Sequence, residues 1–467
     1  MAKINVNSSK VLLIVLSIFA SLFLGLISLI YVQLVGDHYI YLLAPILALA
    51  IALLFIFDRY AFLFIVVMLR ASLDASFNAI KVGSFGIGAI LNALVILIAL
   101  LMLLEKPIKN DLNLSRIKNA WWIYLSLGAF SVFYAVSFVL SLKVFLAYVS
   151  YASMFTLGTY LVKTQADFGK WMKVIVISSF IPVLYSFFSF IFGGRGVTFS
   201  VQEGYRLQST FPHPNPFAPY LVLIISVCFY LYKSKADFIN PKLLKLMPIY
   251  ILILIGLVVM TKTRSAWIAT YLMFFIYALF NDRKFLIYVA LAPLLGLLVP
   301  DIQTRILDLT TGHDFGSTGY ERLNSFAWRL KVWGDGLAYM DKSHYFFGYG
   351  ITSFIPISSQ FIMANAFQKQ NIDIDAHSIF VQTFFELGIF GFLALLNLFY
   401  SVFKTLAHNY NRNKFLVFMT ILSYGQLILQ GATDNLLDYL IVEWYMWFFI
   451  GLSLSYVIKF PVNNSKN

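Results

Sequence analysis

Long apolar runs alternate with short polar connections along almost the whole chain. Runs of about 17–25 residues recur along the chain, and each of these is enough to cross the hydrocarbon core of a bilayer as a helix. The third run is short, so twelve or thirteen spans remain possible. The alternation of positively charged connections along the chain favours fourteen. The predicted spans lie at about 11–35, 40–57, 60–70, 84–104, 120–141, 144–162, 174–192, 216–232, 246–260, 265–280, 285–299, 377–403, 415–432 and 438–459. We therefore predict an all-α integral membrane protein, a single polytopic helical bundle over 1–467 with about 12–14 transmembrane helices.

Composition excludes a soluble globular protein. The chain is 60% hydrophobic and only 12% charged, whereas about a quarter of ordinary soluble residues are charged. A net charge of +13 is compatible with nucleic-acid binding, but the cations gather in short connections between spans, where they set orientation. We therefore expect no nucleic-acid partner. The single cysteine, Cys228, lies in an apolar run, so disulfides and a cysteine-based metal site are excluded.

The lysines and arginines orient the predicted spans. By the positive-inside rule the connections that carry them lie in the cytoplasm, together with both termini. These connections are 106–118, 163–173, 233–245, 283–284 and 404–414. The opposite, outer side then receives 193–215, 261–265 and the long loop 300–376, which joins the eleventh and twelfth spans. Cations in these three segments are retained for some reason other than orientation.

The first outer segment ends in a proline-rich strap that leads into the span at 216–232. Asn215 is expected to cap that helix, with Pro216 at its first position. The prolines keep the approach extended, so Arg206 and His213 are held near the outer membrane face. The alternative for Arg206 is a simple ion pair with lipid phosphate.

The second outer segment is a tight bend that contains Lys262, Thr263 and Arg264. Thr263 is expected to cap the next helix, which brings backbone amides, a hydroxyl and a guanidinium together. A helix N-terminus beside an arginine fork is the chemistry of an anion site. The alternative is an arginine that only extends toward the membrane surface.

The long loop is expected to hold an amphipathic helix from about residue 322. Its apolar residues recur at three- and four-residue spacings, and they are Leu323, Phe326, Leu330, Trp333 and Leu337. Arg322 and Arg329 share one flank of this stripe. Such a helix would lie across the outer mouth of the bundle with its apolar side down.

The loop closes at a histidine where the polar segment becomes an apolar run. Asp375 is expected to cap the helix that follows, which places His377 in its first turn. The positive end of the helix dipole favours the neutral imidazole, the form able to accept a proton. Asp373 and Asp375 favour the protonated form, so these residues leave the outcome open. The alternative is an interfacial histidine without chemistry.

Two carboxylates interrupt the predicted spans, Glu386 and Glu443. Ionisable residues inside a membrane are functional candidates by default and face the bundle interior. Nine residues separate Glu386 from His377, which rotates an ideal helix through roughly 900° and places the two on opposite faces. We therefore expect Glu386 to orient neighbouring helices.

The strap, the bend and the long loop, in this order, resemble the O-antigen ligase/polymerase superfamily, which includes Wzy-type polysaccharide polymerases. The residues that carry the resemblance are Arg206, Thr210–Ala218, Thr263–Trp267, Arg329, Trp333, Phe347–Gly350, His377, Ser378, Gln382, Glu386, Gly388 and Gly391. Many members have Asn where this chain has Ser378. The resemblance covers about residues 190–400, and the first 190 residues resemble the family only in hydrophobicity.

The resemblance implies a metal-independent, cofactor-free, inverting glycosyltransferase of the bacterial cytoplasmic membrane. Its donor would be a glycan linked to polyprenyl diphosphate, such as undecaprenyl diphosphate. A polymerase would extend another lipid-linked unit of O-antigen, capsule or exopolysaccharide, while a ligase would serve a different acceptor, such as lipid A core, protein or a wall polymer. Besides membrane lipid, a flippase and a chain-length regulator are the partners that fit.

Roles for individual residues follow from the same resemblance and from their chemistry. We expect His377, Arg264 and Arg206 to be catalytic, with the arginines on the leaving diphosphate and the histidine as base. The residues expected to contact substrate are Arg322, Arg329, Lys262, His213 and Gln382. A lipid-linked oligosaccharide transporter is the competing class, but transporters place their charges near the membrane midplane.

Overall fold

The computed structural model describes residues 44–75, 81–82, 85–105, 112–200, 204–308, 323–362 and 374–461. The chain divides into two compact units, Met1–Leu69 and Arg70–Asn467. The first contains α2 (Ala44–Phe57) and α3 (Arg59–Leu69), at the second and third predicted spans. The predicted first span, 11–35, lies outside the described residues, as do Arg322 and Asp373.

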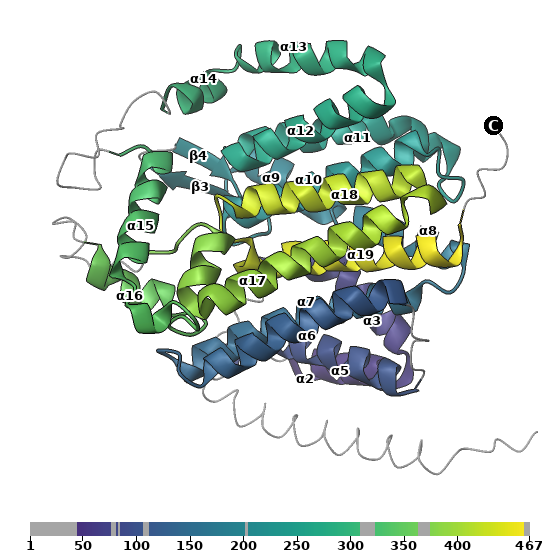
Figure 1. Cartoon of the computed structure of the whole chain (residues 1–467). Coiled ribbons are helices and arrows are strands. Elements are labelled where there is room, and N and C mark those ends of the chain that lie inside the picture. The colour runs from purple at the N-terminus through teal and green to yellow at the C-terminus, as the bar shows by residue number, and fades with distance from the viewer. Residues whose placement is uncertain are drawn as a thin grey trace, which may run out of the picture. The chain divides into compact units, whose positions relative to one another are not determined.

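The second unit is built almost entirely from helices, which confirms the all-α polytopic fold (Figure 1). Its α-helices are α5 (Ile87–Glu105), α6 (Leu112–Val132), α7 (Phe138–Leu161), α8 (Gln165–Ile177), α9 (Phe180–Phe192), α10 (Pro214–Lys233), α11 (Pro241–Met260), α12 (Arg264–Asn281), α13 (Leu286–Gly296), α14 (Pro300–Leu307), α15 (Ser325–Tyr339), α16 (Phe354–Phe361), α17 (Ile379–His408), α18 (Lys414–Gly431) and α19 (Leu440–Lys459). Short 3₁₀ turns are η2 (Arg70–Ser72), η3 (Arg283–Phe285), η5 (Lys342–His344), η6 (Tyr410–Arg412) and η7 (Leu436–Asp438). Two antiparallel hairpins complete it, β1 (Lys81–Val82) with β2 (Phe85–Gly86) and β3 (Val197–Ser200) with β4 (Gly204–Leu207).

Seven segments in the described part are long and apolar enough to cross a membrane. They are Gly88–Glu105, Phe138–Leu161, Gln165–Phe192, Pro214–Lys233, Pro241–Met260, Ile379–His408 and Leu440–Lys459. The predicted span at 120–141 is displaced, because α6 already ends at Val132 and α7 begins at Phe138. The chain is therefore a multi-pass membrane protein, and the total of fourteen spans stays a prediction.

Helix α17 is broken at Gly388, which has φ 64° and ψ −165°. The turn at 345–350 lies against the break, where Gly350 N donates to Glu386 O at 2.8 Å and Ile389 N donates to Tyr345 O at 2.8 Å. These bonds satisfy backbone groups that the interrupted helix leaves open. The part after the break still spans about 30 Å by itself. Glu386 therefore lies on a separate piece before the long span.

We expect Gly388→Ala to destabilise the fold by about 2 kcal/mol or more, because φ > 0 is costly for alanine. A Cβ there would also lie 2.3 Å from the backbone carbon of Phe346. Thermal unfolding of the detergent-purified protein measures the effect. Gly425→Ala in α18 is the control, since its Cβ would meet open space and a helical alanine is favoured. Equal melting temperatures for the two variants would contradict this account of the break.

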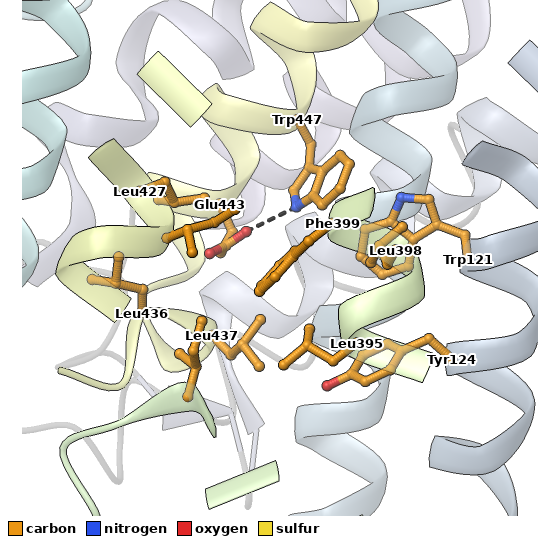
Figure 2. A pocket seen from close by; sticks show the side chains of 12 residues that line it. Trp121, Tyr124, Leu395, Leu398, Phe399, Leu427, Leu436, Leu437, Glu443 and Trp447 are labelled. Atoms are coloured by element: carbon orange, nitrogen blue, oxygen red, sulfur yellow. Dashed lines mark hydrogen bonds between the residues drawn. The ribbon is translucent and has the colours of Figure 1, made fainter. Parts of the chain in front are cut away.

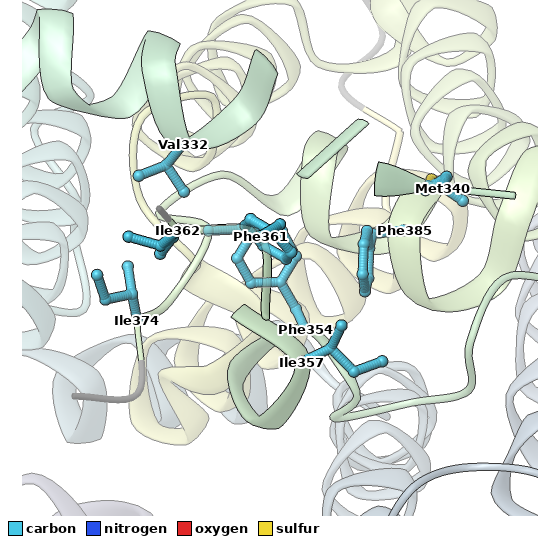
Figure 3. Packing of buried hydrophobic residues seen from close by; sticks show 9 residues of the cluster. Val332, Met340, Phe354, Ile357, Phe361, Ile362, Ile374 and Phe385 are labelled. Carbon is cyan, nitrogen blue, oxygen red and sulfur yellow. The ribbon is translucent and has the colours of Figure 1, made fainter. Parts of the chain in front are cut away.

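Helices α15 and α16 pack on the start of α17 around an apolar cluster (Figure 3). The cluster consists of Val332, Met340, Phe354, Ile357, Phe361, Ile362, Ile374, Ala376 and Phe385. A helix in the long loop is thus confirmed, and Asn324 caps it by accepting from the amides of Phe326 and Ala327.

The face of α15 that is buried within the protein differs from the predicted apolar stripe. Phe326 and Leu330, which belong to the predicted apolar stripe, are 45% and 41% exposed. The buried positions are instead Ala327, Val332 and Gly336. Small residues let the helix approach α16 closely, and this packing decides the buried face.

The segments predicted to lie outside meet at one end of the second unit. Figure 1 shows α15 crossing that end of the long helices, beside the β3–β4 hairpin and the start of α12. Trp333 Nε1 donates to Ala376 O at 2.6 Å, which ties α15 to the residues before α17. Of the cations singled out from the sequence, those in the described part, Arg206, Lys262, Arg264 and Arg329, belong to this end.

Candidate functional site

Arg206 of β4 joins the strap to the bend. Its Nε donates to Thr261 O at 2.8 Å, and its Nη2 donates to Asn215 Oδ1 at 2.8 Å and to Thr263 Oγ1 at 3.2 Å. The guanidinium is buried, and these three acceptors are neutral. Its positive charge is therefore held in a fixed position without cancellation by these partners.

The first residue of α10 and the capping bond of α12, both beside Arg206, differ from those expected. Helix α10 begins at Pro214, and His213 is its N-cap, with Nδ1 accepting from Asn215 N at 3.2 Å. Asn215 is not the cap, because its side-chain oxygen accepts from Arg206. Thr263 is the N-cap residue of α12, as predicted, but its side chain makes no capping bond and also serves Arg206. The arginine thus takes both side chains that the sequence assigns to capping.

Arg264 lies where α12, α14 and α15 meet. Its Nη1 donates to Arg305 O at 3.2 Å, and its Nη2 donates to Ser325 Oγ at 2.5 Å and to Asp308 Oδ2 at 2.9 Å. The Asp308 carboxylate is partly exposed, so the guanidinium already binds an anion near solvent. An incoming phosphate group would compete with Asp308 for the same nitrogen.

Two further cations lie close to these arginines. Arg329 Nη1 donates to Ser325 O at 3.0 Å, so Arg329 and Arg264 converge on the first residue of α15. Lys262 has φ 55°, and its Nζ lies beside Gly204 of β4. The described structure therefore brings four of the five basic side chains predicted for the site to one end of the bundle.

His377 precedes its helix. The N-cap of α17 is Ser378, whose Oγ accepts from Val381 N at 3.5 Å. Asp375 instead accepts from His377 N at 3.4 Å, in a turn that leaves His377 at φ 48°. Both expectations, Asp375 as cap and His377 in the first turn, are wrong, because Ser378 has the extended backbone that a cap requires.

Asp434 is the partner of His377. The His377 Nδ1 and Asp434 Oδ1 atoms are 3.2 Å apart, and the side chains are 29% and 5% exposed. The same oxygen accepts from Tyr439 Oη at 2.8 Å and from Asn435 N at 3.0 Å. Burial by itself would raise the pKa of Asp434, but the bond and charge of His377, followed by Tyr439 and Arg329, hold this pKa below its ordinary value.

The Asp434 carboxylate fixes the tautomer of the His377 imidazole. A carboxylate at Nδ1 keeps the proton on that nitrogen and leaves Nε2 as the atom able to accept another. We did not single out Asp434 from the sequence. The available signal was an acidic residue in the connection between the last two predicted spans, on the same predicted side as His377.

The candidate site has two halves, the arginine cluster and the His377–Asp434 pair, and polar side chains connect them. Arg206 donates to Asn215 Oδ1, and the Asn215 side chain lies near the Tyr439 hydroxyl. Tyr439 donates to Asp434, which is bonded to His377. Arg206 and the His377–Asp434 pair are therefore joined by neighbouring polar side chains.

Gln382 and Glu386 belong to a second, buried network. Gln382 Nε2 donates to Glu386 Oε1 at 3.2 Å, and Phe354 N donates to the same oxygen at 3.3 Å. Asn435 Nδ2 donates to Gln382 Oε1 and to Asp438 Oδ2. This network ties α16 and α17 to the connection before α19.

Two other carboxyl groups near Asp434 are shifted in the opposite direction. Burial raises the pKa of Asp375, although the neighbouring His377 lowers it. Burial, followed by the charges of Asp375 and Asp434, raises the pKa of Asp438 well above its ordinary value. Negative charge therefore concentrates on Asp434, the carboxylate that contacts the histidine.

A narrow apolar pocket lies among α6, α17, α18 and α19 (Figure 2). Trp447 Nε1 donates to Glu443 Oε2 at 2.8 Å within it. The residues of the described part that line it are otherwise aliphatic or aromatic and include no cation. It therefore offers nothing to a diphosphate group, and the candidate site is the cluster around Arg206, Arg264 and His377.

Part of the chain matches a family of known proteins. Residues 249–396 match the family model described as O-antigen ligase. This match confirms the resemblance to the O-antigen ligase/polymerase superfamily and covers Arg264, Arg329 and His377. Arg206 and Asp434 lie on either side of it. None of the curated proteins compared matches the chain.

Proposed function

We propose that the protein transfers a glycan from a polyprenyl-diphosphate donor to the acceptor sugar of another lipid-linked unit, at the outer face of a bacterial cytoplasmic membrane. The observation that carries this proposal is the polar connection from Arg206 to the His377–Asp434 pair at one end of the bundle. The matched family supports glycosyl transfer in the O-antigen pathway and action on lipid-linked glycans.

The chemistry follows from the two halves of the site. The acceptor hydroxyl oxygen forms a bond to the anomeric carbon as the bond from that carbon to the diphosphate oxygen breaks, with inversion. The hydroxyl proton passes to His377 Nε2, and Asp434 stabilises the imidazolium that forms. Arg206 and Arg264 stabilise the negative charge that develops on the leaving diphosphate. No metal or cofactor takes part in this proposal.

The remaining residues have supporting roles. Arg329 and Lys262 border the arginine cluster and would contact glycan or phosphate. The same contact is proposed for Arg322, which lies outside the described residues. His213 caps α10 through Nδ1 and holds the strap, and it would contact substrate from there. Gln382, Glu386 and Asp375 would keep Asp434 and the start of α17 in place.

Transfer to a different acceptor, such as lipid A core, protein or a wall polymer, is the second candidate. The description of the matched family as O-antigen ligase favours it. Both reactions use the same donor and the same leaving group. They differ only in which hydroxyl approaches His377.

The proposal is tested with purified protein reconstituted into lipid vesicles. We expect a lipid-diphosphate repeat unit, supplied alone, to yield a ladder of extended glycans and free lipid diphosphate. A single product formed only after addition of a second acceptor would instead establish the ligase reaction. Formation of no glycosidic bond under either condition, by protein that binds the donor, would refute both.

The orientation in the membrane is tested by labelling. We expect cysteines placed at Ser343 and Asn411, in a Cys228→Ala background, to react with an impermeant maleimide from opposite sides of the membrane. Ser343 should be reached from outside intact cells, and Asn411 only after permeabilisation. Reaction of both from one side would refute the outer location of the site and the cytoplasmic termini.

A further inference from the structure

The β3–β4 hairpin has two chemically different faces. Phe199 and Tyr205 are paired in the register, their rings are 4.9 Å apart, and they are 63% and 70% exposed. The next pair, Thr198 and Arg206, points to the other side because neighbouring residues of a strand alternate. One face therefore holds Arg206 in the candidate site while the other presents two aromatic rings outward.

The base of the hairpin is packed along α9, from its first turn to its last. A Cβ at Gly196 would lie 2.2 Å from Ser189 Oγ and 3.1 Å from Tyr185. Ser209, just after β4, donates from Oγ to Pro182 O at 2.6 Å. The residues just before β3 and just after β4 are thus both attached to α9. This helix is the second half of a segment that is long and apolar enough to span the membrane.

This attachment fixes the level of the aromatic pair. Phe199 lies three residues beyond Gly196, or about 10 Å along a strand. Phe192 lies three residues beyond Ser189, or about 5 Å along a helix. Phe190, Ile191 and Phe192 at the end of α9 are all highly exposed, and β3 begins at Val197, shortly after them, so the aromatic pair lies next to this exposed apolar surface.

We propose that Phe199 and Tyr205 insert into the boundary between headgroups and acyl chains of the adjacent lipid leaflet. Aromatic rings concentrate at this boundary, and a tyrosine can bury its ring while its hydroxyl remains hydrated. The exposed Arg195, between α9 and β3, is placed to meet lipid phosphate at the same level. The hairpin is then an anchor that sets the depth of Arg206 in the membrane.

The functional consequence rests on the proposed function. The polyprenyl chain fixes the depth of the donor's diphosphate, so anchoring Arg206 to the same interface aligns the two before binding. We expect Phe199→Ser/Tyr205→Ser to raise the KM for a membrane-embedded donor on the order of tenfold, which is the effect of losing about 1.4 kcal/mol. Turnover at saturation, and KM for a short-chain donor in detergent, should stay unchanged.

Phe199→Trp/Tyr205→Trp is the matched control, because tryptophan also prefers the interface and should restore the low KM. Equal losses with embedded and short-chain donors would show a local structural role and overturn the anchor. An increase in KM that appears only with longer glycans would point instead to a sugar-stacking platform, which also contradicts the proposal.

A second measurement needs no activity and so separates this proposal from the proposed function. An environment-sensitive fluorophore is attached to Tyr205→Cys in a Cys228→Ala background, in vesicles of phosphatidylcholine and phosphatidylglycerol. We expect lipids spin-labelled near the headgroup to quench it, and aqueous iodide to quench it weakly. The same label at the exposed, polar Ser343 should show the reverse. Equal iodide quenching at the two positions would overturn the anchor whatever the enzyme does.

Discussion

His377→Ala is expected to reduce turnover about 10²–10⁴-fold, as is typical when a general base is lost, while leaving donor binding nearly intact. The arginines that we assign to the diphosphate do not contact His377 directly. Arg206 is linked to it through Asn215, Tyr439 and Asp434. His377→Gln should be about as slow, because glutamine donates and accepts hydrogen bonds but takes up no proton.

The measurement compares donor binding and glycan formation for both variants in reconstituted protein. His344→Gln is the matched control, since that histidine is stacked on Tyr349 at 3.9 Å and makes no contact with the arginine cluster in the described structure. Near-normal turnover by His377→Gln would make His377 a positioning group. Loss of donor binding in both variants would place it in the diphosphate site instead.

The spans were predicted well where a long apolar run can form only one kind of structure, a helix in the membrane. Most runs became helices within a few residues of the expected bounds, because crossing a bilayer demands a helix of that length. The break at Gly388 was not predictable in this way. The run from Ile379 onward is continuously apolar, and the break depends on the turn at 345–350, whose amides and carbonyls complete the interrupted helix.

The candidate site was predictable in composition but not in local geometry. Arg206, Arg264 and His377 were identifiable because the predicted topology assigns these polar groups to the outer side. The cap predicted at Asn215 was wrong, and the predicted cap Thr263 makes no capping bond. Capping preference is local, whereas both side chains accept from Arg206, which belongs to another segment. Asp434 was not predicted, because it lies next to His377 only after folding brings the start of α17 and the connection after α18 together.

Asp434→Asn is expected to lower turnover by roughly 10²–10⁴-fold, comparable to the loss of the aspartate that orients a catalytic histidine. An asparagine can donate to Nδ1 and favour the wrong tautomer, and it leaves the imidazolium without a counter-charge.

Stability should respond to pH with a definite sign. The pKa of Asp434 is lower in the folded protein than its ordinary value. Its contribution is therefore present above the ordinary aspartate range, near pH 4, and is lost as the pH falls through the depressed folded value. Asp434→Asn should have a lower melting temperature than the parent at neutral pH, and the difference should shrink as the pH is lowered below about 4.

Tyr439→Phe distinguishes the connection from simple packing. It keeps the ring and removes the hydroxyl that joins Asp434 to Asn215. If the contacts couple the arginine to the histidine, this variant should lower turnover less than Asp434→Asn and weaken donor binding through Arg206. Turnover, donor affinity and melting temperature are measured together for both variants. A Tyr439→Phe protein that is merely less stable, with unchanged donor affinity, would show that Asp434 acts on His377 independently of the arginine.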